Sequence, residues 1–309
     1  MIHQMKSFFS LMKSLPDKKS CREFLEEQRW NGVPVCPHCG YIDEHHYKLT
    51  FFEEFNGLYK CRHCRKRSTV TSGTMFEGSN IPLDKWFYAI YLFLSHKKGI
   101  SSLQLSRDIE VTQKTAWFIL NRIRYNLMRE GIGNHEGIVQ VDETYIGGKS
   151  KGRFKFNRGR SMKQKIPVVG LLSDDKTHAY VVSNTKGSTL EFIIAGLVED
   201  GTTVVTDSWG GYHYISDFGY THEVVEHGIW KYVNERGFHT NGIEGFWSHL
   251  KRGLKGIYHS VRPKHLQMYC DEFAYRYNTR KMDDIQRFIQ FLTKPSERVR
   301  YSELTCGFI

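Results

Sequence analysis

The stretch GIVQVDETYIGG, residues 137–148, decides the fold prediction because a run of β-branched residues leads there into a carboxylate, Asp142. Such a run is typical of a buried strand. Residues 202–207, TTVVTD, repeat the pattern and end in Asp207. A carboxylate buried at a strand end is costly unless a cation or hydrogen bonds stabilise it. The two strand ends therefore indicate a cation site.

A third carboxylate, Glu244, lies in HTNGIEGFWSHLKR, residues 239–252, a segment with helical spacing. If it converges with Asp142 and Asp207, the three carboxylates would offer the oxygen ligands that Mg²⁺ or Mn²⁺ prefers. A second interpretation stays open. Asn241 and Glu244 are spaced like a capping box, in which the glutamate only starts the helix.

The wider pattern from residue 137 onward predicts a mixed α/β sheet. Side chains alternate across a strand, so Glu143 points away from Asp142 and is predicted to be a rim or fold residue. Strands are expected over residues 137–146, 167–173, 178–183 and 202–207, with a helix over 188–198.

The chain of 309 residues carries 44 Lys and Arg against 33 Asp and Glu, a formal net charge of +11. This excess favours a polyanionic partner, while 14% aromatic and 40% hydrophobic residues exclude a disordered basic tail. No apolar run approaches the roughly 18 residues that a membrane span needs, and the N-terminus has no persuasive signal peptide. We therefore expect a cytoplasmic, nucleoid-associated protein without a membrane partner.

Four of the seven cysteines form two CxxC pairs, Cys36 with Cys39 and Cys61 with Cys64. Each tight turn aims two thiolates at one tetrahedral ion, so the spacing predicts a zinc ribbon with one structural Zn²⁺ per chain. Disulfides or redox pairs are the alternative, which a cytoplasmic location disfavours. The other three cysteines are expected to be ordinary thiols.

Residues 101–127 suggest a helix-turn-helix, in which a second helix enters a DNA groove. Ser101 or Ser102 can cap a short first helix, and Thr112 can cap a longer basic one. An ordinary helical hairpin with a solvated charged face is the alternative, since helical periodicity alone does not imply DNA. The candidate DNA-reading residues are Lys114, Thr115 and Arg122.

Two basic segments are candidates for contacts with phosphates. The stretch 149–165 holds eight basic residues and no acidic ones, so it is either a solvated loop or a clamp on a phosphate backbone. Two lysines further on share a helical face with Glu244. The candidates are Lys149, Lys151, Arg153, Lys155, Lys251 and Lys255.

Four motifs, in this order, resemble the DDE transposases of bacterial insertion sequences. They are VDETYIGGK (141–149), TDSWGGY (206–212), HTNGIEGFWSHLKRGLKGIY (239–258) and EFAYRYNTR (272–280). The resemblance extends from about Phe24 to Arg280 and is greatest to the subgroup with an N-terminal zinc ribbon. It implies that the chain binds the terminal inverted repeats of a mobile element. It also implies metal-dependent DNA cleavage and strand transfer, the chemistry of transposition.

For this chain the resemblance implies an RNase H-like core in which Asp142, Asp207 and Glu244 hold two Mg²⁺ or Mn²⁺ ions, with Asp142 as the bridging ligand. His239 and Asn241 are possible support residues near the scissile phosphate.

The resemblance also places Lys251 at a position that contacts transposon-end DNA. The expected partners are double-stranded DNA, both transposon ends and target. A homodimer or higher oligomer is expected on DNA, because two ends must be held at once.

The predicted fold is α+β, with a mixed-sheet catalytic core preceded by a zinc ribbon and a helical region. Two other function classes stay open: a zinc-ribbon and helix-turn-helix regulator, and an RNase H-like nuclease or resolvase that never joins ends. The expected segments are a helical segment 1–32, zinc ribbon 33–72, helix-turn-helix-like region 80–132, catalytic domain 135–280 and tail 281–309.

Overall fold

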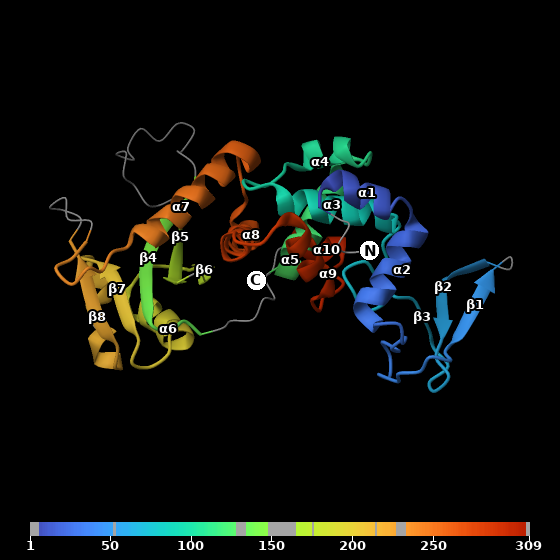
Figure 1. Ribbon diagram of the computed structural model, residues 1–309. Helices are drawn as coiled ribbons and strands as arrows, with labels where there is room; N and C mark the ends of the chain where they lie inside the picture. Colours follow the sequence, from blue (N-terminus) through green and yellow to red (C-terminus); the bar gives the residue numbers. More distant parts are fainter. Residues whose placement is uncertain are drawn as a thin grey trace. The chain divides into compact units, whose positions relative to one another are not determined.

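A computed structural model describes residues 6–51, 54–127, 134–147, 165–174, 176–213, 215–226 and 233–306 (Figure 1). The chain divides into two compact units. The first contains Met1–Asn126 and Lys281–Cys306, and the second contains Leu127–Arg280. Within the described ranges, no helix is long and apolar enough to cross a membrane. Lys149, Lys151, Arg153 and Lys155 lie outside the described residues.

The first unit begins with two helices and a small sheet. Helices α1 (Phe8–Ser14) and α2 (Lys18–Trp30) each start with a capping box, at Ser7 and Asp17. The antiparallel sheet follows in the order β1-β2-β3. Its strands are β1 (Tyr47–Phe51), β2 (Glu54–Lys60) and β3 (Arg67–Ser68).

Three further helices complete the N-terminal part of this unit: α3 (Leu83–Ser95), α4 (Ser102–Asp108) and α5 (Gln113–Leu127). Of the two predicted caps for α4, the structure uses Ser101, whose hydroxyl accepts the amide of Gln104 at 3.0 Å. The predicted cap of α5 is confirmed, because the Thr112 hydroxyl accepts the amide of Thr115 at 3.2 Å.

The C-terminal segment belongs to the first unit and forms helices α9 (Asp284–Thr293) and α10 (Tyr301–Cys306). Aromatic contacts help to attach it. The Phe288 ring of α9 lies edge-on to Phe87 and Tyr91 of α3, with ring centres 5.7 and 6.1 Å apart. Phe288 is fully buried, so the C-terminal segment contributes to the first unit's core.

The second unit is built on a five-stranded mixed sheet in the order β6-β5-β4-β7-β8 (Figure 1). Strand β5 is antiparallel to β4 and β6, whereas β4, β7 and β8 are parallel. This order and these directions are those of an RNase H-like core, so the predicted mixed sheet is confirmed. The strands are β4 (Ile138–Ile146), β5 (Ile166–Ser173), β6 (Lys176–Val181), β7 (Thr203–Asp207) and β8 (Thr221–Val225).

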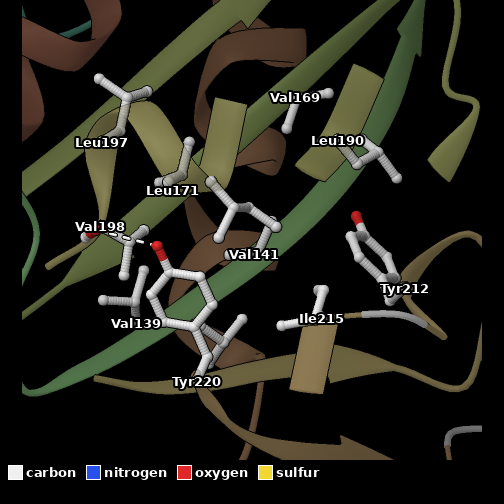
Figure 2. Packing of buried hydrophobic residues seen from close by; sticks show 12 residues of the cluster. Val139, Val141, Val169, Leu171, Leu190, Leu197, Val198, Tyr212, Ile215 and Tyr220 are labelled. Atoms are coloured by element: carbon white, nitrogen blue, oxygen red, sulfur yellow. Dashed lines mark hydrogen bonds between the residues drawn. The ribbon is translucent and has the colours of Figure 1, made fainter. Parts of the chain in front are cut away.

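One face of this sheet packs against helix α6 (Gly187–Leu197) and the short 3₁₀ turns after β7, η2 (Gly210–Tyr212) and η3 (Ile215–Phe218). Figure 2 shows Tyr212 and Ile215 beside Val141 of the central strand. The strand residues of this cluster are Val139, Val141, Val169, Leu171 and Val204, which alternate along their strands.

The opposite face packs against helices α7 (Asn241–Gly253) and α8 (Leu266–Asn278). A π-helical turn η5 (Leu254–Tyr258) and a 3₁₀ turn η6 (Pro263–His265) connect them. The strand residues of this second cluster are Val168, Leu172 and Ala179, and its helical residues include Ile243, Phe246, Trp247 and Leu250.

Side chains of α8 cover the outer edge of strand β6. The Asn278 side chain accepts the amide of Thr177 at 2.8 Å and donates to its carbonyl at 3.1 Å. Gln267 accepts the amide of Val181 at 2.8 Å and donates to the carbonyl of Ala179 at 2.8 Å. These amides satisfy backbone groups that an open edge would offer to another strand.

Candidate functional site

The register of two parallel strands brings Asp142 and Asp207 to one level. Gln140 of β4 pairs with Val205 of β7, and continuing that register by two residues places Asp142 opposite Asp207. Residues at one level of adjacent strands point to the same face of the sheet. The two carboxylates therefore share a face.

That shared face is the one covered by α7. The side-chain oxygen of Gln140 accepts the backbone amide of Ile243 at 3.0 Å, and the Asp142 carboxylate accepts the indole N–H of Trp247 at 2.9 Å. Both donors belong to α7, the helix that also carries Glu244. All three predicted carboxylates thus come from elements that meet on one side of the sheet.

The strand predicted over residues 137–146 is confirmed as β4 (Ile138–Ile146), and only the expectation that Asp142 stands at a strand end is wrong. Asp207 ends β7 as expected, but β4 continues beyond Asp142 to Ile146. The reason is that β4 keeps pairing with β5 as far as Ile146, whereas its pairing with β7 ends at Gln140. Asp142 therefore lies two residues beyond the last residue of β4 that pairs with β7, and not at the end of its own strand.

Burial and neighbouring charge act together on Asp142. Desolvation raises the pKa of its carboxyl to about 7, and the negative charges of Glu143 and Asp207 act in the same direction. Two hydrogen bonds oppose this rise, from the indole of Trp247 and from the backbone amide of Glu143, the latter at 2.9 Å. A nearby cation would favour the ionised form.

Glu143 points to the opposite face, as the predicted alternation requires. Its carboxylate accepts the hydroxyl of Tyr212 at 2.7 Å, on the side covered by α6 and η2. Burial raises the pKa of Glu143, and the charge of Asp207 adds to that rise. Glu143 is thus a half-buried, hydrogen-bonded residue whose charge still reaches the site.

The capping-box interpretation of Asn241 and Glu244 is wrong. Helix α7 begins at Asn241, its N-cap residue is Thr240, and the Thr240 side chain makes no capping hydrogen bond. Asn241 is therefore the first helical residue rather than the cap. Glu244 lies in the first turn and is exposed. His239, just before the helix, is exposed as well.

The three carboxylates do not form a group that the structure alone identifies as a metal site. Among the residues that the structure describes, such a group of three or more metal-ligand side chains consists of cysteines, whose Sγ atoms all lie within 4.8 Å of one another.

The cysteine group has the geometry of a zinc site. The Sγ atoms of Cys36 and Cys64 are 3.7 Å apart, and those of Cys39 and Cys61 are also 3.7 Å apart. A tetrahedral ion with Zn–S bonds of about 2.3 Å requires S–S separations of about 3.8 Å. The predicted four-thiolate set therefore fits Zn²⁺.

The candidate DNA-reading residues of α5 differ in accessibility. Lys114 is exposed, with its ammonium 5.0 Å from the ring centre of Tyr301 in α10. Thr115 is half-buried, and its hydroxyl lies 2.9 Å from that of Thr112. Arg122 is 2% exposed and donates to the carbonyl of Val299. The prediction that Arg122 contacts DNA is wrong, because its guanidinium points into the first unit.

The sequence interpretation missed two residues at this site. Trp247 carries no ligand or charge signal in the sequence, but its indole N–H donates to Asp142. Gly170 lies in the middle of β5 and pairs with Asp142. A glycine inside a strand indicates that another group approaches the backbone closely. Gly170 in PVVGLLS, residues 167–173, therefore predicts such an approach from the sequence alone.

Comparison with known proteins places two domains on this chain. Residues 16–67 match the transposase zinc-ribbon domain, and residues 135–278 match the ISXO2-like transposase domain.

Two relatives agree with these matches. An uncharacterized protein in transposable element ISH50 of Halobacterium salinarum is 28% identical over 258 residues, which cover 79% of this chain and 85% of the relative. An uncharacterized transposase-like protein of Haemophilus influenzae is 27% identical over 121 residues, 39% of this chain and 96% of the relative.

Among solved structures, a Mos1 transposase paired-end complex with left transposon end matches at 11% identity and a TM-score of 0.23, covering 68% of this chain and 80% of that one. The Drosophila P element transposase strand transfer complex matches at 11% identity and a TM-score of 0.28, covering 65% and 57%. With both domains matched along one chain, the protein belongs to the family of insertion-sequence transposases that join an N-terminal zinc ribbon to an ISXO2-like transposase domain.

Proposed function

We propose that this transposase binds the terminal inverted repeats of its own element and catalyses both cleavage and strand transfer with Asp142, Asp207 and Glu244. The observation that carries the proposal is the parallel register, which sets Asp142 level with Asp207 on the face covered by α7, the helix that carries Glu244. Such carboxylates repel one another unless cations lie between them.

Two divalent cations, Mg²⁺ or Mn²⁺, fit this arrangement. The donors are all carboxylate oxygens, which these ions prefer. Asp142, Asp207 and Glu244 would hold the cations. When bound, the cations would supply an activated attacking oxygen and stabilise the leaving oxygen of an in-line phosphoryl transfer.

The side chains along α7 would hold the DNA strand. Lys251 is exposed in the last turn of α7, and Lys255 is exposed in the π-helical turn that follows. They lie on the same helical face as Glu244, about two and three turns further on. Their ammonium groups would contact phosphates next to the scissile one. His239 and Asn241, exposed at the start of α7, are placed to contact that phosphate or a water.

Recognition of the element's ends would fall to the first unit. Lys114 and Thr115 lie at the start of α5, the end that a recognition helix inserts into the major groove. One Zn²⁺ per chain, held by the four cysteines, would stabilise the ribbon without taking part in the chemistry, since a closed thiolate site offers no open position. Two ends must be held together, so we propose a dimer or higher oligomer on DNA.

The test uses isosteric variants of the three carboxylates. Asp142→Asn, Asp207→Asn and Glu244→Gln should each lower strand transfer by about 100-fold or more, because even one preorganised charge-stabilising group contributes about that much. The substrates are duplexes that carry the inverted repeats bracketing the reading frame, with Mg²⁺. Asp217→Asn, an exposed carboxylate of the same unit, is the matched control and should keep full activity.

Each variant should keep its affinity for end DNA and lose none of its melting temperature. If one of the three variants kept full strand-transfer activity, the residue changed in that variant would not belong to the catalytic site. Cleavage by the unmodified chain without joined products would favour a nuclease or resolvase instead, and binding without cleavage would favour a regulator.

A further inference from the structure

Gly170 leaves room for the indole of Trp247 beside Asp142. Gly170 is paired directly with Asp142 across β4 and β5. A Cβ atom built on Gly170 would lie 2.5 Å from Cζ2 of Trp247, 2.6 Å from its Cη2 and 2.8 Å from Cδ1 of Ile243. Carbon atoms in contact normally stay about 3.5–4.0 Å apart. The indole therefore fills the space where any other residue would place its side chain.

This packing sets the indole N–H on one oxygen of Asp142. Trp247 is 4% exposed, and its Nε1 donates to Oδ2 of Asp142 at 2.9 Å. The other oxygen, Oδ1, accepts the backbone amide of Glu143 at 2.9 Å. Each carboxylate oxygen thus has one fixed donor, so the carboxylate plane cannot turn freely about its χ2 bond.

Volume alone does not explain this tryptophan. A phenylalanine would retain most of the apolar contact with Ile243 and the rest of the cluster on this face. Only the indole N–H requires a polar partner, and here that partner is a carboxylate of the candidate site. The packing role and the hydrogen-bonding role of Trp247 can therefore be separated by one substitution.

We infer that Trp247, packed over Gly170, is a positioning residue that fixes the Asp142 carboxylate in the orientation in which it receives divalent cations. The inference rests on the proposed function of Asp142 as a metal ligand. Residues that hydrogen-bond a ligand orient it, and their loss typically lowers metal affinity 10–100-fold. Glu244 is carried by the same helix, so the contact also couples the α7 position to the Asp142 orientation.

The experiment measures Mn²⁺ binding to the full-length, zinc-loaded chain without DNA, by the electron paramagnetic resonance signal of free Mn²⁺. Trp247→Phe should weaken binding about 10–100-fold while the melting temperature falls little. Gly170→Ala should weaken Mn²⁺ binding as well, because the new methyl group displaces the indole.

Each variant has a matched control. Trp86→Phe also removes a buried indole donor, one that donates to the hydroxyl of Ser79 at 2.9 Å in the first unit, and it should leave Mn²⁺ affinity unchanged. Gly196→Ala, at an α6 position with open space around its Cβ, controls for Gly170→Ala.

A second measurement does not depend on whether the Trp247 variant folds. The chain has six tryptophans, and their indole N–H groups give separate ¹H–¹⁵N resonances. The chemical shift of one indole resonance should change when Mg²⁺ is added to the wild-type chain. The same resonance should also differ in chemical shift between the wild-type chain and Asp142→Asn. No shift of any indole resonance with Mg²⁺ would overturn the inference.

Wild-type Mn²⁺ affinity in Trp247→Phe would also overturn it, provided that Asp142→Asn has lost binding. The proposed function would then stand without the positioning role. If Asp142→Asn itself binds Mn²⁺ like the wild type, the metal site assigned to Asp142 fails, and the inference fails with it.

Discussion

Replacing Arg122 with alanine should destabilise the first unit without changing its preference for end DNA over random DNA. The guanidinium is enclosed, with Nε and Nη2 donating to the carbonyl of Val299 at 3.0 and 2.7 Å. Its centre lies 4.8 Å from the ring centre of Phe118. The hydrogen bonds attach α5 to the C-terminal segment of the same unit, whereas the contact with Phe118 lies within α5.

Two opposing effects set the magnitude. Two hydrogen bonds from a charged donor contribute about 1.5–3 kcal/mol each, and the contact with the aromatic ring about 1 kcal/mol more. Against this, burial lowers the pKa of Arg122 to about 10 from its ordinary 12.5. At about 1.4 kcal/mol per unit, burying the charge costs about 3 kcal/mol, which alanine recovers. The hydrogen bonds and the ring contact outweigh the cost of burying the charge. Arg122→Ala should therefore lower the free energy of unfolding by about 3 kcal/mol, or the melting temperature by roughly 10 °C for a unit of this size.

The assay pairs thermal unfolding, followed by circular dichroism, with fluorescence anisotropy on end and random duplexes below the variant's transition. The ratio of the two affinities should stay within about twofold, because a buried side chain makes no base-edge contact. Arg107→Ala, which removes an exposed arginine of α4, is the control and should keep its melting temperature. An unchanged melting temperature together with lost discrimination would show that Arg122 reads DNA and that the burial argument is wrong.

Three further outcomes are expected. Lys114→Ala, at an exposed position, should lower the ratio of end to random DNA affinity about 10-fold without loss of stability, and anisotropy competition measures it. Cys61→Ser should reduce bound zinc below one equivalent and unfold the ribbon, as metal analysis and proteolysis would detect, whereas zinc-free wild-type protein would contradict the site. Burial raises the pKa of Asp271 to about 7, so the folded chain holds a proton that the unfolded chain loses near its ordinary value of 3.8, and stability falls as pH rises between these values. Asp271→Asn should therefore raise the melting temperature at pH 8 but not at pH 4, and equal effects at both would contradict the shift.

The sequence predicted the central strands because their signal is local. Strands β4, β5 and β7 are apolar, β-branched runs buried by helices on both faces, so periodicity alone marks them. Strand β8, THEVV, was missed because its polar residues are stabilised by distant partners. Thr206 contacts the ring of His222 at 2.8 Å, and Arg236 pairs with Glu223 at 2.6 Å.

The types of residue in the candidate site were predictable from the sequence, but the contacts between their side chains were not. The carboxylates stand out because they interrupt or follow apolar runs, and the paired cysteine spacing identifies the ribbon. Arg122 looked like a basic residue of a recognition helix, because periodicity does not reveal that the C-terminal segment covers that face. Neither Trp247 nor Gly170 carries a charge. The glycine inside β5 signals that some group approaches closely, but only the folded sheet shows that the group is Trp247 and that it contacts Asp142.

The start of α7 shows how the sheet itself positions the third carboxylate. The first amides of a helix lack intrahelical partners, and an N-cap side chain normally accepts the amide of the second or third residue. Here the third residue, Ile243, donates instead to the side chain of Gln140 in β4. A Cβ on Gly242 would lie 2.8 Å from that same Gln140 oxygen, so the close approach requires glycine. Gln140 is two residues before Asp142, and Ile243 immediately precedes Glu244. One hydrogen bond thus fixes where the helix begins and at which level of the sheet Glu244 is presented.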